Sequence, residues 1–211
     1  MLLYYITDRK AFAGTEAQQR ERMLRRIAEA ARAGIDYIQL REKDLSAREF
    51  ERLSHDAVQA VRDNSAVTKL LINSRTDVTL AVGAHGVHLP AGELPATEVR
   101  ALWMRCAGRE PVIGVSAHTA AEVRCAQEQT ADFVVLAPIF EKVQTATPGI
   151  GLAALTGACV GFSGTFAVLA LGGVTVSNAR PCIEAGAAGV AGIRLFQQGD
   201  VFETVRRLRG L

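Results

Sequence analysis

The chain has 211 residues, of which 49% are hydrophobic and 22% charged, the balance of an ordinary globular protein. Its net charge of +2 gives no sign of a nucleic-acid-binding or general membrane-binding surface. No apolar run is long enough to span a bilayer or to serve as a signal peptide, and four widely spaced cysteines without a zinc-binding pattern favour reduced thiols in a cytoplasmic protein.

Short apolar runs recur along the chain, and most are followed by an amphipathic stretch. The runs predict eight strands, at residues 2–7, 35–40, 69–73, 86–89, 111–116, 132–137, 165–171 and 188–193. The stretches between and after them predict helices at residues 16–34, 46–63, 76–82, 95–106, 119–129, 151–158, 177–185 and 200–209. Ser46 and Glu49 have the spacing of a capping box at the start of the second helix.

Strands that are apolar on both faces and alternate with helices indicate an all-parallel sheet covered by helices. Eight such units predict a TIM (β/α)8 barrel, with residues 1–211 forming a single domain. An open doubly wound sheet is the alternative. It is disfavoured because no G-x-G-x-x-G motif follows the first strand. We therefore look for functional residues at the carboxyl ends of the strands, where TIM barrels carry their active sites.

The stretch YIQLREKDL leads from the second predicted strand into a cluster of charges. Gln39, Arg41 and Lys43 alternate along it, so in an extended chain they share one face. Two cations and an amide suit a phosphate or pyrophosphate, because charge-assisted hydrogen bonds offset desolvation. The alternative is a solvated loop in which Arg41 pairs with Glu42 or Asp44. We favour the anion site because of the period-two spacing.

Polar side chains also follow the third, fourth and fifth predicted strands. Asn73 is placed either to contact a polar ring or to cap the next helix. Glu93 can approach a cation or a substrate amine, although a charge at a helix N-terminus is the simpler interpretation. His118 is the best acid–base candidate, because histidine titrates near neutral pH and Ser116 stands two residues before it.

The last two predicted strands end in residues typical of a phosphate site. Gly172 and Gly173 follow the seventh strand, and Ile193 and Arg194 close the eighth. In TIM barrels, glycines after strand seven and backbone N–H groups after strand eight commonly bind phosphate. The long loop at residues 141–151 is placed to cover a substrate. Two separate anion sites predict two phosphorylated substrates, or one substrate with two anionic ends.

Six segments in order cover nearly the whole chain: YYITDRK, YIQLREKDLSAREF, LLINSRTDVTLAVGAHGVHLP, IGVSAHTAAEV, ADFVVLAPIF and LALGGVTVSNARPCIEAGAAGVAGI. Together they resemble the thiamine phosphate synthase/TenI family. The resemblance implies a TIM barrel that acts in thiamine biosynthesis, and a homodimer is compatible with it. In the synthase branch, hydroxymethylpyrimidine pyrophosphate loses pyrophosphate, and the nitrogen of thiazole phosphate captures the resulting cation.

The resemblance also implies which residues contact each substrate. Its pyrophosphate and pyrimidine contacts map onto Gln39, Arg41, Lys43, Asn73 and Ser116. Its thiazole phosphate contacts map onto Gly172, Gly173, Ile193 and Arg194. Both sets agree with the two anion sites expected from the residues themselves.

Several departures from the synthase pattern favour the TenI branch. Ser74 and Glu93 stand where the synthase has two magnesium-binding aspartates, and magnesium prefers carboxylates together with substrate phosphates. KVQT (142–145) replaces Thr-x-Thr-Lys, and Arg194 replaces the usual serine. The TenI branch aromatises a thiazole carboxylate phosphate by proton transfer without a metal, and its catalytic histidine maps onto His118.

We therefore expect a metal-independent thiazole tautomerase in which His118 transfers the proton and no cofactor is needed. The first alternative is a magnesium-dependent thiamine phosphate synthase with a weakened metal site around Glu93. The retained Gln39, Arg41 and Lys43 favour this alternative. The second alternative is a non-catalytic or regulatory protein that binds thiazole phosphate and has lost the chemistry.

Overall fold

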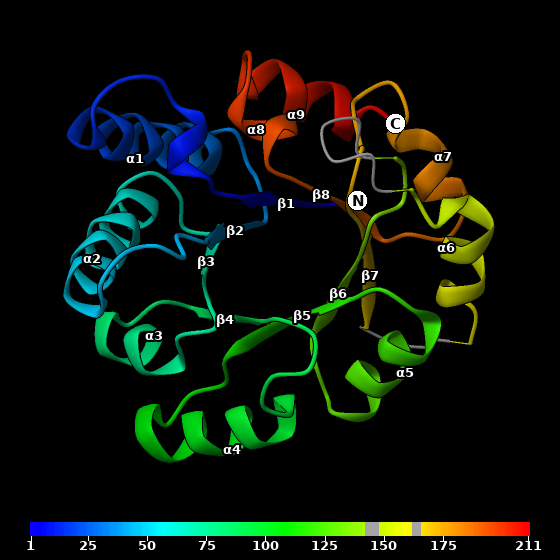
Figure 1. Cartoon of the computed structure of the whole chain (residues 1–211), viewed down its shortest axis with the longest axis horizontal. Helices are drawn as coiled ribbons and strands as arrows, with labels where there is room; N and C mark the ends of the chain where they lie inside the picture. The colour runs from blue at the N-terminus through cyan, green and yellow to red at the C-terminus, as the bar shows by residue number, and fades with distance from the viewer. Residues whose placement is uncertain (142–147, 162–165) are drawn as a thin grey trace.

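The strands form a closed barrel in the computed structural model of the chain, and helices surround it (Figure 1). The structure describes residues 1–141, 148–161 and 166–211. The strands are β1 (Leu2–Ile6), β2 (Tyr37–Leu40), β3 (Lys69–Asn73), β4 (Gly86–Leu89), β5 (Val112–Ala117), β6 (Phe133–Leu136), β7 (Ala167–Ala170) and β8 (Gly189–Gly192). Each pairs in parallel with the next, and β8 pairs with β1. This closure confirms the predicted TIM barrel over the open sheet.

The predicted helices are present, with boundaries shifted by a few residues. They are α1 (Glu16–Arg32), α2 (Ala47–Arg62), α3 (Thr76–Val82), α4 (Ala96–Ala107), α5 (Ala120–Glu128), α6 (Gly151–Cys159), α7 (Ala179–Glu184) and α9 (Val201–Arg209). Two short elements were not predicted, the 3-10 turn η1 (Arg9–Ala11) and helix α8 (Arg194–Gln197). Among the helices of the described ranges, none combines the length and apolar character needed to cross a membrane.

Capping at the helix ends follows the sequence signals. Ser46 accepts a hydrogen bond from the backbone N–H of Glu49, whose side chain accepts one from the N–H of Ser46, so the predicted capping box is confirmed. Thr15 and Gln18 form a second capping box at the start of α1. These caps fix where α1 and α2 begin, and thereby the length of the loops that lead to them from β1 and β2.

The barrel interior is a packed core. Tyr4, Leu71 and Phe133 point into it and are at most 1% exposed. Tyr37 stacks on Phe133 with ring centroids 4.9 Å apart, and the ring of Tyr4 meets Phe133 edge-on at 5.2 Å. Replacing Phe133 with alanine would cost about 3–5 kcal/mol, as for other large core side chains. Because the interior is filled, ligands have access only at the ends of the barrel.

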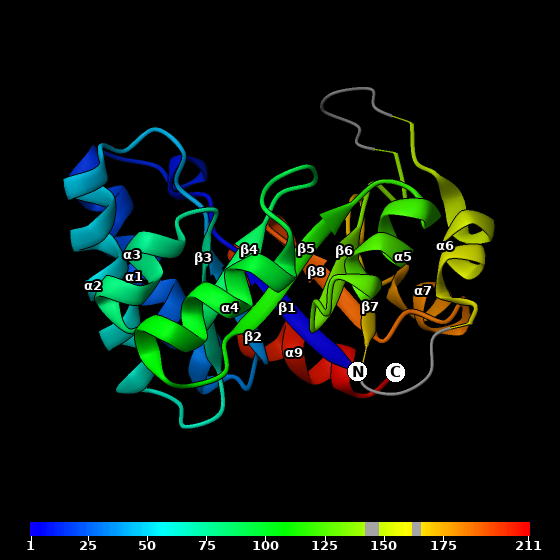
Figure 2. The same ribbon diagram turned by 90° about the horizontal axis from the view of Figure 1, so that it is seen from below.

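Figure 2 shows the barrel from the side and separates its two ends. The loop after β4 lies at one end, and both chain termini lie at the other. Since the strands are parallel, all their carboxyl ends lie at the end away from the N-terminus of β1. The predicted functional residues follow these carboxyl ends, so the topology gathers them on one rim.

Candidate active site

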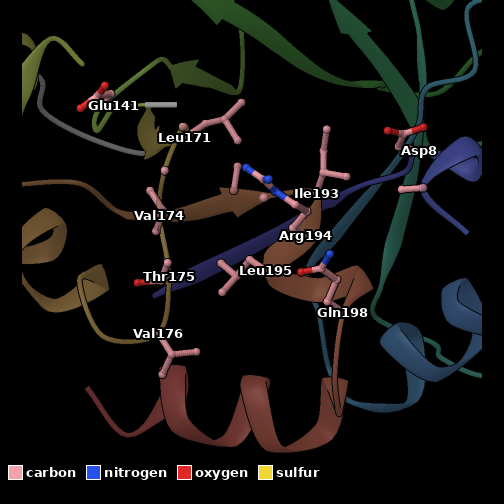
Figure 3. A pocket seen from close by; sticks show the side chains of 15 residues that line it. Asp8, Glu141, Leu171, Val174, Thr175, Val176, Ile193, Arg194, Leu195 and Gln198 are labelled. Carbon is pink, nitrogen blue, oxygen red and sulfur yellow. The ribbon is translucent and has the colours of Figure 1, made fainter. Parts of the chain in front are cut away.

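Two cavities open along the carboxyl-terminal rim. The larger, about 960 Å³, lies beside β7 and β8 and includes the predicted residues Gly172, Gly173, Ile193 and Arg194 in its lining (Figure 3). The smaller, about 360 Å³, lies after β2, β3 and β4. Its lining includes Lys43, Asn73 and Glu93. The glycines and Arg194 of the second predicted anion site thus line one cavity, whereas Lys43 alone of Gln39, Arg41 and Lys43 lines the other.

The glycine pair after β7 is required by backbone conformation and by close packing. Gly172 and Gly173 have φ angles of +94° and +65°, a region that favours glycine. A Cβ on Gly172 would lie 2.6 Å from the Cα of Pro138, and one on Gly173 would lie 2.7 Å from the Cβ of Phe140. The pair thus lets the chain after β7 lie against the segment after β6 while lining the larger cavity.

Unpaired backbone donors line the larger cavity. Within the described ranges, the N–H groups of Gly173, Arg194 and Leu195 have no hydrogen-bond partner. Strand β8 ends at Gly192, so Arg194 is the first residue of α8 rather than part of a strand. Figure 3 shows its side chain extending into the middle of the cavity, between the segments that carry Leu171 and Ile193. Backbone N–H groups and a guanidinium together suit a phosphate.

The smaller cavity is lined by side chains that bond to one another. The amide of Asn73 donates to the hydroxyl of Ser74 at 3.0 Å, and this hydroxyl donates to the carboxylate of Glu93 at 2.9 Å. The predicted capping role of Asn73 is wrong, because α3 has Arg75 as its N-cap residue and no side-chain cap. Asn73 instead belongs to the wall of the smaller cavity.

A magnesium ion in the smaller cavity would have few protein ligands. The available donors are the carboxylate of Glu93, the hydroxyl of Ser74 and the amide oxygen of Asn73, since the carboxylate of Glu42, which also lines the cavity, is bonded by Arg9 and Thr7. In the part of the chain that the structure describes, no three His, Cys, Asp or Glu residues gather as a metal site. Magnesium is commonly held by one or two carboxylates together with substrate phosphates. The residues therefore fit an ion shared between Glu93 and a diphosphate, and do not fit one held by protein alone.

Arg41 and Lys43 lie in the loop after β2 and not in the strand itself. Strand β2 ends at Leu40, so its alternation places Gln39 on the inner face but does not extend to Arg41 and Lys43. Arg41 is half-buried and Lys43 exposed, and neither has an ion-pair partner among the described residues. The alternative interpretation, in which Arg41 pairs with Glu42 or Asp44, is wrong because Arg9 takes both carboxylates.

Arg9 neutralises the acidic residues of this loop. Its side chain is 3% exposed, and its guanidinium lies 2.9 Å from Glu42, 2.7 Å from Asp44 and 2.8 Å from Glu16. Hydrogen bonds from Arg9 and then Lys10 hold the pKa of Asp44 well below its usual range. Burial raises the pKa of Glu42, although hydrogen bonds from Arg9 act in the opposite direction. The cluster keeps negative charge away from the neighbouring cations.

A second set of bonds fixes the backbone beside the Arg9 cluster. The hydroxyl of Thr7 donates to Glu42 at 2.9 Å and accepts the backbone N–H of Arg41 at 3.0 Å. The chain at Arg41 is thereby tied to β1 and to the buried carboxylate. Sequence reasoning missed Arg9 as a positioning residue. The available signal was a cation in TDRK, directly after a strand that neighbours β2 in the barrel.

Below the rim, four polar side chains form a chain of hydrogen bonds across the barrel. Gln39 Nε2 donates to the hydroxyl of Tyr4 at 2.8 Å, and this hydroxyl lies 3.1 Å from Nδ1 of His88. Nε2 of His88 lies 2.9 Å from Oγ of Ser116. Burial, and then the charge of Arg41, lower the pKa of His88 to about 3, so its ring is neutral at neutral pH. Sequence reasoning gave His88 no role.

His118 follows the last residue of β5 and is exposed at the rim. Its Nδ1 lies 2.8 Å from the carbonyl oxygen of Ala137. Because a carbonyl only accepts, Nδ1 carries a proton, and in the neutral ring Nε2 keeps its lone pair. Nε2 has no hydrogen-bond partner among the residues that the structure places. His118 is therefore arranged as a proton acceptor.

Some predicted residues lie outside both cavities. Gln39, Arg41, Ser116 and His118 are absent from the two linings. The predicted cover at residues 141–151 falls partly, and the replaced motif KVQT (142–145) wholly, outside the described residues. The structure does place Glu141 in the wall of the larger cavity.

Comparisons with known proteins identify the family of the chain. Residues 3–196 match the family model described as thiamine monophosphate synthase. The chain is 38% identical over 193 residues to a thiamine-phosphate synthase of Roseiflexus sp., covering 90% of this chain and 75% of the relative. It is 37% identical over 212 residues to one of Methanoculleus marisnigri, covering 98% and 93%.

Among solved structures, the fold resembles thiamine phosphate pyrophosphorylase from Pyrococcus furiosus with a TM-score of 0.79 at 27% identity. That match covers 99% of this chain and 94% of the other. A family model that spans nearly the whole chain and relatives above 30% identity support one conclusion: this chain belongs to the thiamine monophosphate synthase family.

Proposed function

We propose that this protein is a thiamine phosphate synthase, which transfers a hydroxymethylpyrimidine group from its diphosphate to the ring nitrogen of thiazole phosphate. The observation that carries the proposal is the presence of two separate cavities with anion-binding groups on one rim. Joining two phosphorylated substrates needs both, whereas a tautomerase acting on one phosphate needs a single site. The names of the similar relatives favour the synthase over the tautomerase expected from the sequence.

The side chains after β2 and β3 suit the diphosphate. In the reaction, the bond between the methylene carbon and the diphosphate oxygen breaks, and its electron pair leaves with the diphosphate. Arg41 and Lys43 have no carboxylate partner among the described residues, so their charge is available to the leaving group. A bound magnesium ion would be held by Glu93 and would further neutralise the diphosphate.

The larger cavity suits the thiazole phosphate. Its unpaired backbone N–H groups and Arg194 bind the phosphate and orient the ring, and the lone pair of the thiazole nitrogen then forms the new bond to the methylene carbon. With the phosphate of one substrate and the diphosphate of the other bound at different cavities, both reacting atoms are held over the same barrel mouth.

Thiazole tautomerase is the second candidate, and the geometry of His118 favours it. The free lone pair of Nε2 can accept a proton from a non-aromatic thiazole tautomer bound beside it. This reaction uses the larger cavity for the phosphate and gives no role to Arg41 and Lys43.

One assay separates these functions. The protein is incubated with both phosphorylated substrates, with magnesium and then with chelator, and separately with the non-aromatic tautomer. The proposal predicts thiamine phosphate and pyrophosphate in equal amounts, with a raised KM for the pyrimidine diphosphate in Arg41→Met. Aromatisation without thiamine phosphate, abolished in His118→Ala, would establish the tautomerase instead. Tight thiazole phosphate binding without either product would establish the non-catalytic binder.

A further inference from the structure

The side chain of His88 is held in one position inside the barrel. It is 3% exposed, and its ring centroid lies 5.7 Å from that of Tyr4 and 6.3 Å from that of Phe133. Gly114 on β5 leaves room for it, since a Cβ there would lie 2.8 Å from Nδ1 of His88 and 2.5 Å from Phe133. The ring therefore has no space to turn, and each of its nitrogens keeps one partner.

The proton on the Tyr4 hydroxyl has one acceptor. This hydroxyl is fully buried, burial raises its pKa, and the phenol keeps its proton at neutral pH. Its oxygen already accepts from Gln39 Nε2. Among the described residues, the remaining partner is Nδ1 of His88, so the phenol donates to Nδ1. The opposite tautomer of His88 would leave a buried phenol proton without an acceptor, which disfavours it by a factor of about ten or more.

The same reasoning assigns the donors and acceptors of the hydrogen bonds that lead from His88 to Ser116 at the rim. With Nδ1 accepting and the ring neutral, Nε2 of His88 carries the proton and donates to Oγ of Ser116. The hydroxyl proton of Ser116 then has no acceptor in the described chain and is available to a ligand. At the other end, Nε2 of Gln39 is engaged by Tyr4, and its Oε1 is available as an acceptor.

We infer that Tyr4 and His88 are positioning residues that fix Ser116 as a hydrogen-bond donor and Gln39 as an acceptor toward the heteroaromatic substrate. An aminopyrimidine matches this polarity, because its ring nitrogens accept and its exocyclic amine donates. The inference deepens the proposed function, since it concerns recognition of the pyrimidine substrate at the same rim. Tyr4 and His88 are both buried, so they act through the bonds that they make to Gln39 and Ser116.

The direct test is the tautomer of His88, measured by 15N NMR on the wild-type protein. The signal is assigned by its loss in His88→Gln, which leaves three of the four histidines. The inference predicts an unprotonated Nδ1 and a protonated Nε2. A protonated Nδ1 would overturn it, because Ser116 would then donate to the ring and no longer to a ligand. This readout needs neither a folded variant of Tyr4 nor enzymatic turnover.

The functional test compares two buried tyrosines. Tyr4→Phe removes the donor to Nδ1, whereas Tyr5→Phe removes an equivalent hydroxyl that donates to Gln197 at 3.0 Å. Tyr4→Phe is expected to weaken binding of the free hydroxymethyl aminopyrimidine about tenfold, to leave thiazole phosphate binding unchanged and to give a mixed His88 tautomer. Tyr5→Phe should change none of these.

Equal effects of the two variants on aminopyrimidine affinity would show a purely structural role and overturn the inference. Binding is measured by titration calorimetry with the aminopyrimidine alone, so the result does not depend on synthase activity. If the protein makes no thiamine phosphate but the tautomer and the difference between the tyrosine variants are as predicted, the proposed function fails and the positioning role stands.

Discussion

The two anion sites that we propose on the rim are built from different parts of the polypeptide. At the end of β7 and β8, the donors are mainly backbone N–H groups, placed by Gly172 and Gly173 and by the first turn of α8. At the end of β2 and β3, the donors are side chains, chiefly Arg41 and Lys43, on a loop held by Arg9. The first site depends on chain conformation, and the second depends on a balance of charges.

This difference predicts different sensitivity to substitution. A backbone donor survives replacement of its own side chain and is lost only when the chain path changes. A side-chain donor is lost with one substitution, or when a neighbouring carboxylate is released to pair with it. Anion binding at the first site should therefore be most sensitive to substitution of its glycines, and binding at the second site to substitution of its charged residues.

The largest effect is expected from breaking the Arg9 cluster. Arg9→Met leaves Glu42 buried without its cation, which should lower the free energy of unfolding by about 3–5 kcal/mol. Glu42 and Asp44 would also become available to Arg41 and Lys43, so the KM for the pyrimidine diphosphate should rise. Urea unfolding and steady-state kinetics measure the two effects.

Arg20→Met is the matched control, because Arg20 pairs with Glu16 and Glu49 at the surface. It should cost under about 1 kcal/mol and leave the KM unchanged. Similar small losses in Arg9→Met and Arg20→Met would show that the cluster does not hold the loop.

Exchanging the two arginines of the rim for methionine sharpens the comparison. Arg41→Met should raise the KM for the pyrimidine diphosphate about tenfold to a hundredfold. This range corresponds to the loss of one hydrogen bond to a charged group, which contributes about 1.5–3 kcal/mol. Arg194→Met should raise the KM for thiazole phosphate less, because the backbone donors remain. An Arg194 effect that exceeds the Arg41 effect would reverse the comparison.

The glycine site is tested by two alanine substitutions with the same backbone strain. Gly173→Ala should cost about 1–3 kcal/mol of stability from its positive φ and raise the KM for thiazole phosphate through its contact with Phe140. Gly199 has a φ of +64° and open space around it, so Gly199→Ala should show the strain alone. Equal KM values in the two variants would exclude a binding role for the Gly173 turn.

The smallest effect concerns acid. Because Arg9 lowers the pKa of Asp44 in the folded protein, ionised Asp44 contributes its full stabilisation above pH 3.8, the usual pKa of the group. This contribution is lost below pH 3.8, as the pH falls toward the lowered pKa of the folded state. Asp44→Asn should therefore be less stable than wild type near neutral pH, by under about 1 kcal/mol, and the difference should vanish in acid. Thermal unfolding of both proteins from neutral pH into acid measures this difference in stability, and a difference that does not change with pH would contradict this account.

The fold was predictable because its signal repeats. Each strand is a short apolar run and each long helix has a polar and an apolar face, so eight repetitions compensate for uncertain boundaries. Helix α8 and the turn η1 span too few residues to show a period, which is why neither was expected. The consequence was that Arg194 was assigned to a strand end and not to a helix start.

The sites were predictable to the extent that topology defines them. Gly172, Gly173 and Asn73 line cavities because they follow or end strands, and the positions of the strands can be predicted from the apolar runs of the sequence. The partners of Arg9 and His88 were not predictable in the same way. Arg9 meets Glu42 from 33 residues away, and His88 meets Tyr4 from 84 residues away, so both contacts depend on barrel register.

The central claim is that two anions bind at once, one after β7 and β8 and the other after β2 and β3. The most direct measurement is calorimetric titration of thiazole phosphate into the protein, with and without saturating inorganic pyrophosphate and magnesium. The account predicts one thiazole phosphate per chain in both conditions, with unchanged affinity. An apparent Kd that rises in proportion to the pyrophosphate concentration would show a single shared site and contradict it.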